Sequence, residues 1–181
     1  MTCVAAYIDG EVVVMTSDSA SIDTEGFVAI REPNSKVWKA SIGTEDILVG
    51  FSGDFGVGSY IHHSFQWPIK HFNECMFTYF SRSLEILEKT ICRRFDKKDL
   101  DWALLIGAGK QLFTLAPGGY IETTVEKFAA IGSGETIAKG ALFILQHTTE
   151  PSWRKLEECL IAASHFDSSV RRPFCTEYLM K

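Results

Sequence analysis

Short runs of apolar and β-branched residues recur along this chain, and they predict β-strands. The first predicted element is a hairpin over residues 1–18, with two apolar arms and Asp9-Gly10 between them. That pair is a strong hairpin signal, because glycine tolerates the positive φ that a tight turn requires. A marginal strand is expected at 27–30, and Pro33-Asn34 predicts a turn after it. Further strands are predicted at residues 35–41, 46–52, 102–108, 111–115, 120–124, 127–131 and 173–180.

Apolar residues at intervals of three or four predict four helices. The first spans about 54–66 and ends before Trp67-Pro68, because a residue that precedes proline disfavours the helical conformation. The second continues to about Phe95, with an apolar stripe at Phe72, Met76, Phe80, Leu84, Leu87 and Ile91. The third follows Gly132-Ser133-Gly134 and has an apolar face at Ile137, Ala141, Leu142 and Leu145. The fourth has Pro151 at its first position and buries Leu156, Leu160 and Ala163.

The order of these elements indicates the fold class. Several strands are followed by two helices, several more strands, two more helices and a last strand. Two helices follow each other without an intervening strand, at two places in the chain. This order argues against a parallel sheet of Rossmann type, in which single helices alternate with strands, and favours layered antiparallel sheets. We therefore expect an α+β fold, a four-layer αββα sandwich, in one domain that spans residues 1–181, a length sufficient for a single core.

Composition narrows the function classes. The chain has 46% hydrophobic and 23% charged residues and a formal net charge of -5, which argues against general nucleic-acid binding. No apolar segment approaches ~20 residues, and the beginning of the chain lacks the pattern of a signal peptide. We expect neither secretion nor a membrane span, and place the protein in the cytoplasm.

The cysteines and histidines do not suggest a metal site or a disulfide framework. The five cysteines are scattered, odd in number and without a C-x-x-C pair, so we interpret them as reduced and mostly buried thiols. His62 and His63 are adjacent on a predicted helix and face different directions, which disfavours ligation of one metal ion. We expect no metal and no cofactor.

The beginning of the chain carries candidate chemistry. If Met1 is removed, Thr2 becomes the first residue, and its hydroxyl lies beside its own α-amine. Such an amine titrates near ~8 and can act as a base for the hydroxyl. Many ordinary chains also begin Met-Thr, so these two residues alone do not establish a nucleophile. Cys3 is a rival nucleophile, but adjacent strand residues face opposite sides, and a thiol in the core is the favoured interpretation.

Several short motifs, taken together, resemble those of a known family. They are Thr2-Cys3-Val4, Ser17-Asp18-Ser19, Lys36-Val37, Gly50-Phe51-Ser52-Gly53, Ala130-Ile131-Gly132-Ser133-Gly134 and Asp167-Ser168-Ser169. In their order and spacing they resemble the proteasome β-subunit family of N-terminal-nucleophile hydrolases, which includes the peptidase of the HslU/HslV system. The resemblance is strongest to short bacterial and phage proteasome-like proteins that begin Met-Thr-Cys. It implies the same αββα sandwich as the order of elements.

The resemblance implies roles for three residues. Thr2 would be the nucleophile, Asp18 lies 18 − 2 = 16 positions later as the family's acidic residue does, and Lys36 follows on the next strand. A lysine ammonium near a threonine hydroxyl lowers the cost of alkoxide character, and a buried aspartate orients that lysine. Without the resemblance, Asp18 and Lys36 would be interpreted as an ordinary ion pair or as surface charges.

Other matching positions would support the reaction. Gly53 matches the glycine whose backbone N–H forms the oxyanion hole. Ser133 matches the serine that bonds the nucleophile's amine, and Asp167 with Ser168 or Ser169 matches the pair that supports it. Ser133 is alternatively a helix N-cap.

Two positions at the end of one predicted strand bear on specificity. Phe51 matches the residue that floors the first specificity pocket, and it is alternatively a buried strand residue. Asp54 replaces a glycine that is usual in the family, which puts a carboxylate beside the predicted site and disfavours acidic substrates.

The sequence thus favours a threonine peptidase acting on peptides or unfolded polypeptide. The family implies a homo-oligomeric ring or stacked rings and, as a partner, an ATPase unfoldase. No propeptide precedes Met1, so we expect activation by a methionine aminopeptidase. The alternatives are an amidohydrolase acting on a small amide and a catalytically inactive ring-forming subunit.

Overall fold

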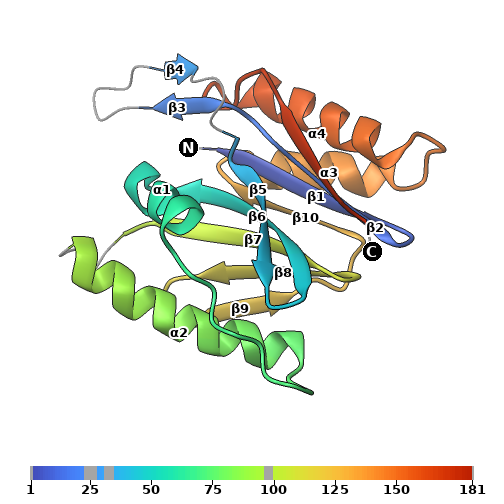
Figure 1. The fold of residues 1–181 in the computed structure, drawn as a ribbon. Helices are drawn as coiled ribbons and strands as arrows, with labels where there is room; N and C mark the ends of the chain where they lie inside the picture. The colour runs from blue at the N-terminus through green and yellow to red at the C-terminus, as the bar shows by residue number, and fades with distance from the viewer. Residues whose placement is uncertain (1, 23–27, 31–34, 96–99, 181) are drawn as a thin grey trace.

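The computed structural model describes residues 2–22, 28–30, 35–95 and 100–180. Two antiparallel sheets lie face to face, and a pair of helices covers the outer face of each sheet (Figure 1). The predicted α+β fold with four αββα layers is confirmed. The turn predicted at Pro33-Asn34 lies outside the described residues.

The first sheet contains both arms of the predicted hairpin. Its order is β10-β1-β2-β11, and the strands are β1 (Cys3–Asp9), β2 (Val12–Ser17), β10 (Phe128–Gly132) and β11 (Cys175–Met180). The hairpin turns at Gly10, where φ is 62°, as predicted. β2 pairs with β1 on one side and with β11 on the other, so Ser17 is in register with both Val4 and Cys175.

The second sheet has the order β5-β6-β7-β8-β9. Its strands are β5 (Val37–Ile42), β6 (Glu45–Gly53), β7 (Trp102–Ala108), β8 (Gln111–Ala116) and β9 (Tyr120–Thr123). β6 is buried on both faces from Ile47 to Ser52, as its apolar run predicts. A small separate sheet pairs β3 (Ala20–Ile22) with β4 (Val28–Ile30).

Three apolar clusters hold the four layers together. The first lies between the second sheet and helices α1 (Phe55–His63) and α2 (Met76–Phe95), and includes Phe51, Phe80 and Phe113. The second lies between the first sheet and helices α3 (Glu135–Leu145) and α4 (Ser152–Phe166), and includes Cys3. The third lies between the sheets, where Val4 and Met15 face Leu48 and Leu105. Among the described helices, none is long and apolar enough to cross a membrane.

The largest error in the predicted elements concerns the start of the long helix. α2 begins at Met76, and Phe72, which was assigned to its apolar stripe, precedes the helix and is 95% exposed. The remaining stripe, from Phe80 to Ile91, is buried. The start is fixed by polar contacts: Glu74 accepts a hydrogen bond from the His71 N–H and is bridged to Arg82 at 2.9 Å.

Smaller corrections concern individual side chains. Cys3 and Cys159 are buried, but Cys75 and Cys92 are exposed, so the thiols are not mostly buried. Pro151 caps α4 rather than occupying its first position.

The histidine pair also differs from its prediction. The rings of His62 and His63 do not diverge but stack with centroids 4.2 Å apart. His62 stacks in turn on Trp38 of β5, so the last turn of α1 packs on that strand.

Candidate functional site

Strand ends from both sheets meet on one side of the sandwich. In the first sheet β1 begins where β2 and β10 end, because Cys3 pairs with Gly132 and Val4 with Ser17. In the second sheet β5 begins where β6 ends. The antiparallel order therefore gathers residues that are far apart in the sequence at a common edge.

Lys36 connects the two sheets at this edge. Its Nζ donates to Thr2 Oγ1 at 2.8 Å and to Asp18 Oδ1 at 2.8 Å. The Asp18 side chain is 0% exposed and that of Lys36 is 16% exposed. The structure thus brings together the three residues that the sequence singled out as a reactive group.

The buried carboxylate of Asp18 is well compensated. Besides the ammonium, its oxygens accept hydrogen bonds from the backbone N–H groups of Cys3 and Ala20, each at 3.0 Å. These donors and the ammonium offset the cost of burying the carboxylate. Asp18 therefore fixes both the hairpin end and the lysine.

The lysine is less basic than an exposed one. Burial lowers the pKa of Lys36, and the nearby carboxylate of Asp18 only partly opposes this effect. A lowered pKa makes proton release from the ammonium less costly, which suits a group that exchanges protons with a threonine hydroxyl.

A chain of hydroxyls surrounds the backbone of Thr2. The Thr2 N–H donates to Ser133 Oγ at 3.3 Å, and Ser133 Oγ lies 3.1 Å from Ser169 Oγ. Ser169 Oγ donates to Asp167 Oδ1 at 2.5 Å. Since the proton of Ser169 is given to Asp167, Ser169 can only accept from Ser133, whose hydroxyl also lies within donor distance of the Thr2 carbonyl oxygen at 3.3 Å.

The geometry here bears on two alternatives, namely whether Ser168 or Ser169 bonds to Asp167 and whether Ser133 caps α3. Ser169 is buried and bonded to Asp167, whereas Ser168 is exposed. Ser133 is not the N-cap of α3, because Gly134 occupies that position without a side-chain hydrogen bond. Burial raises the pKa of the Asp167 carboxyl, but hydrogen bonds from Ser133 and Ser169 outweigh it and leave the pKa below its usual value.

Gly53 ends β6 in a conformation that requires glycine. Its φ is 122°, and a Cβ there would lie 2.2 Å from the backbone oxygen of Asp101. Asp54 follows, and its Oδ1 accepts from the N–H groups of Gly56 and Val57, so its carboxylate caps α1. The cap fixes the backbone next to Gly53.

Phe51 is a core residue in this structure. It is 6% exposed and belongs to the cluster under α1 and α2. A Cβ on Gly58 of α1 would lie 2.5 Å from its ring, so the helix backbone packs directly on Phe51.

Three further polar residues lie at this edge, and the sequence motifs assign no role to any of them. Ser17 precedes Asp18, and Cys175 pairs with Ser17 across β11. Ser52 and the Thr2 backbone both crowd Gly132. A Cβ added to Gly132 would collide with the Thr2 carbonyl oxygen and would lie 2.9 Å from Ser52 Oγ. The Ser17-Asp18-Ser19 motif pointed to Ser17, whereas Cys175 depends on a strand pairing that no local pattern reveals.

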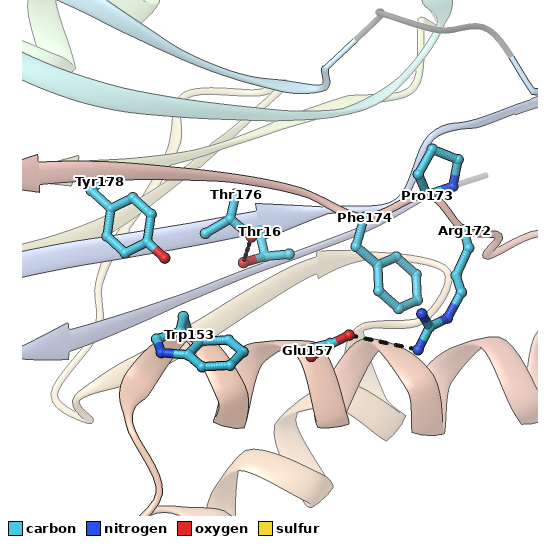
Figure 2. Close-up of a pocket in the computed structure, with 8 residues that line it drawn as sticks. All are labelled: Thr16, Trp153, Glu157, Arg172, Pro173, Phe174, Thr176 and Tyr178. Carbon is cyan, nitrogen blue, oxygen red and sulfur yellow. Dashed lines mark hydrogen bonds and ion pairs between the residues drawn. The ribbon is translucent and has the colours of Figure 1, made fainter.

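The described residues contain no group of three or more His, Cys, Asp or Glu side chains arranged for a metal ion. A pocket of about 330 Å³ lies elsewhere, between α4 and the edge strand β11 (Figure 2). Trp153 and Phe174 line it, and Thr16 and Thr176 bond to each other across its floor at 3.0 Å. None of the predicted site residues lines this pocket.

Comparison with known proteins identifies the fold. By sequence, the chain matches neither a protein-family model nor a curated protein. By structure, it is similar to eukaryotic HslV from Trypanosoma brucei, with a TM-score of 0.72 and 18% identity, covering 99% of this chain and 100% of that one. BPH from Thiobacillus denitrificans, in complex with epoxomicin, gives a TM-score of 0.80 and 16% identity, covering 99% and 98%. Anbu from Pseudomonas aeruginosa, a helical assembly, gives 0.73 and 16%, covering 99% and 81%.

These similarities extend over the whole chain, and they show that its fold is the one shared by HslV, BPH and Anbu. This is the proteasome-like fold of N-terminal-nucleophile hydrolases that the sequence motifs imply.

Proposed function

We propose that the chain is a threonine peptidase of the proteasome-like class, in which Thr2 becomes reactive when Met1 is removed. The observation that carries this proposal is the position of Lys36 Nζ, 2.8 Å from both Thr2 Oγ1 and Asp18 Oδ1. An ammonium in this position stabilises negative charge that develops on the threonine oxygen. We also infer that the chain is grouped with the short proteins that begin Met-Thr-Cys.

In the proposed reaction, the free α-amine of Thr2 accepts the proton of Oγ1 while the oxygen attacks the carbonyl carbon of a peptide bond. The bond from that carbon to nitrogen then breaks, and the leaving amine takes the proton. An ester of Thr2 remains, and water hydrolyses it with the α-amine as base, which restores the hydroxyl.

The surrounding groups have supporting roles in this proposal. The Gly53 N–H stabilises the oxyanion, a contribution of about 10²–10³ in rate for one such donor in other enzymes. Ser133, with Ser169 and Asp167 behind it, holds the nitrogen of Thr2 in place. Phe51 lies under the first substrate side chain and limits the depth of its pocket.

Met1 controls this chemistry. While Met1 is attached, the nitrogen of Thr2 is an amide that donates to Ser133, and an amide nitrogen does not act as a base at neutral pH. Removal of one residue therefore turns the same atom into a base.

We propose that the active form is a homo-oligomer in the cytoplasm. The similarity to HslV and to the helical Anbu assembly supports self-association. An assembly that limits access to Thr2 would restrict cleavage to peptides and unfolded chains, delivered by an ATPase unfoldase where one is present.

The test is hydrolysis of fluorogenic peptides by protein whose intact mass shows that Met1 is absent. Thr2→Ala should reduce turnover to the background rate, and Thr136→Ala, which changes an exposed threonine on α3, should not. Hydrolysis of small amides but not peptides would favour the amidohydrolase. No hydrolysis of either class by Met1-free protein would favour the inactive subunit.

A further inference from the structure

A second group of polar side chains lies around Cys175, where Ser17 and Ser19 flank Asp18, the partner of Lys36. Cys175 begins β11 and pairs with Ser17 of β2, so the two side chains are on the same face of the first sheet. That face is the one between the sheets, because Val13 and Met15 of β2 belong to the inter-sheet cluster. Cys175 is a free, partly buried thiol.

Ser19 fixes the direction of the thiol. Its hydroxyl donates to the Pro173 carbonyl at 2.5 Å, and its oxygen lies 3.5 Å from Cys175 Sγ. Since the only proton of Ser19 is given to Pro173, the thiol donates to Ser19.

Ser17 supplies a donor that has no partner. Its side chain is 0% exposed, and its Oγ is the single buried side-chain polar atom in the described chain without a hydrogen-bond partner. Such atoms are rare and each calls for an explanation, because an unsatisfied buried hydroxyl destabilises the fold. This hydroxyl is next to Cys175 across the sheet.

Lys36 senses the charge of Cys175. Burial lowers the pKa of Lys36 and Asp18 raises it, and negative charge on Cys175 raises it as well. Asp18, the partner of Lys36, directly follows Ser17, so Cys175 and the ammonium both lie at this end of β2.

We propose that Cys175 is a site of reversible oxidation by hydrogen peroxide, and that the sulfenic acid formed there turns off the Thr2 site by engaging Lys36. The thiolate sulfur attacks one peroxide oxygen, the O–O bond breaks, and the departing hydroxide takes a proton to become water. Sulfur is oxidised and peroxide is reduced. A thiol reductant reverses the step through a mixed disulfide.

The new oxygen explains the unpartnered hydroxyl. The sulfenic oxygen accepts a hydrogen bond from Ser17 Oγ, which has no other acceptor among the described residues. Negative charge on that oxygen attracts the Lys36 ammonium and competes with Thr2 Oγ1 for its proton. The second half of the proposal rests on the proposed peptidase function, whereas the oxidation itself does not.

Oxidation is measured first, on the full chain treated with hydrogen peroxide and trapped with dimedone, which reacts with sulfenic acids. Peptide mapping should find the adduct on Cys175, and Lys36→Met should slow its formation because the ammonium that the proposal places on the new oxygen is lost. Ser17→Ala should lower the yield of adduct. A peroxide-treated chain with adducts on exposed Cys75 or Cys92 but none on Cys175 would overturn the site.

Peptidase activity is measured on parallel samples that are treated with peroxide but not with dimedone, because the dimedone adduct is a thioether that thiol reductants do not remove. Peroxide should reduce turnover by about tenfold or more, as expected when a proton-transfer group is disabled. A reductant should restore turnover, and Cys175→Ser should resist peroxide while Cys92→Ser should not. Labelled Cys175 with unchanged turnover would overturn the coupling to Lys36. If Thr2 has no peptidase activity, labelling of Cys175 in Lys36→Met still tests whether Lys36 interacts with Cys175. The oxidation proposal and the peptidase proposal can therefore be contradicted independently.

Discussion

Lys36 Nζ and Thr2 Oγ1 lie 2.8 Å apart although they come from different sheets of the sandwich. The contact depends on two strand ends that meet at one edge and on Asp18, which holds the other side of the ammonium. A lysine in this position is not explained by packing alone, since its side chain is directed to polar partners at the end of an apolar inter-sheet core.

Replacing Lys36 tests this contact. Lys36→Met should lower kcat by about 10²–10⁴, the range for groups that take part in proton transfer. It should also destabilise the fold by up to about 3 kcal/mol, because Asp18 remains buried without its cation. Lys39→Met is the matched control, as Lys39 is exposed on β5, the strand that begins directly after Lys36. Equal peptidase rates in the two variants would contradict the role of Lys36.

The pH dependence of turnover should report the charge of Lys36. Burial lowers the pKa of Lys36. As pH rises, activity that needs the ammonium should therefore begin to decline at a pH below ~10.4, the usual lysine pKa. Asp18→Asn removes the carboxylate that raises this pKa, and the alkaline limb of kcat/KM should move to lower pH. Asp101→Asn changes an exposed side chain and should leave the limb in place. An unmoved limb in Asp18→Asn would count against the assignment.

The cysteines should differ in their rates of alkylation by iodoacetamide. Burial, followed by the charge of Asp18, raises the pKa of Cys3 to about 12, so Cys3 should be alkylated only after unfolding. Hydrogen bonds from Thr78 lower the pKa of exposed Cys75, which should react faster than exposed Cys92 near pH 7. Peptide mapping over time checks this order, and early labelling of Cys3 would contradict its burial.

Two helical glycines should respond oppositely to the same substitution. Gly58→Ala puts a Cβ 2.5 Å from the buried Phe51 ring and should destabilise the fold by about 1–3 kcal/mol. Gly140→Ala, on α3 with no atom within 4 Å of the new Cβ, should stabilise it by up to about 1 kcal/mol. Urea denaturation measures both. Stabilisation by Gly58→Ala would show that α1 does not pack tightly on Phe51.

Local patterns were sufficient for most elements, whereas Asp18 and Lys36 were singled out only through the family resemblance. The apolar run at Trp102–Ala108 forms β7 with the same bounds. The spacing of Thr2 and Asp18 was informative because a hairpin register is fixed by its turn, and the register puts the Asp18 N–H 3.1 Å from the Cys3 carbonyl.

What the sequence could not predict depends on long-range contacts or on competing polar groups. The interval from Phe72 to Met76 fits a helix, but bonds from His71 and Arg82 to Glu74 organise that segment before α2 begins. Cys175 reaches Ser17 through a pairing across most of the chain length. Such a pairing follows from the sheet order β10-β1-β2-β11 and leaves no local signal.

The most direct test of the central claim uses one protein with different extents of Met1 removal. Methionine aminopeptidase would be applied for increasing times, and each sample would be measured for the Met1-free fraction by intact mass and for peptide hydrolysis. We predict that the rate rises in proportion to the Met1-free fraction and stays at background throughout in Thr2→Ala. A rate independent of that fraction, or undiminished in Thr2→Ala, would contradict Thr2 as the nucleophile.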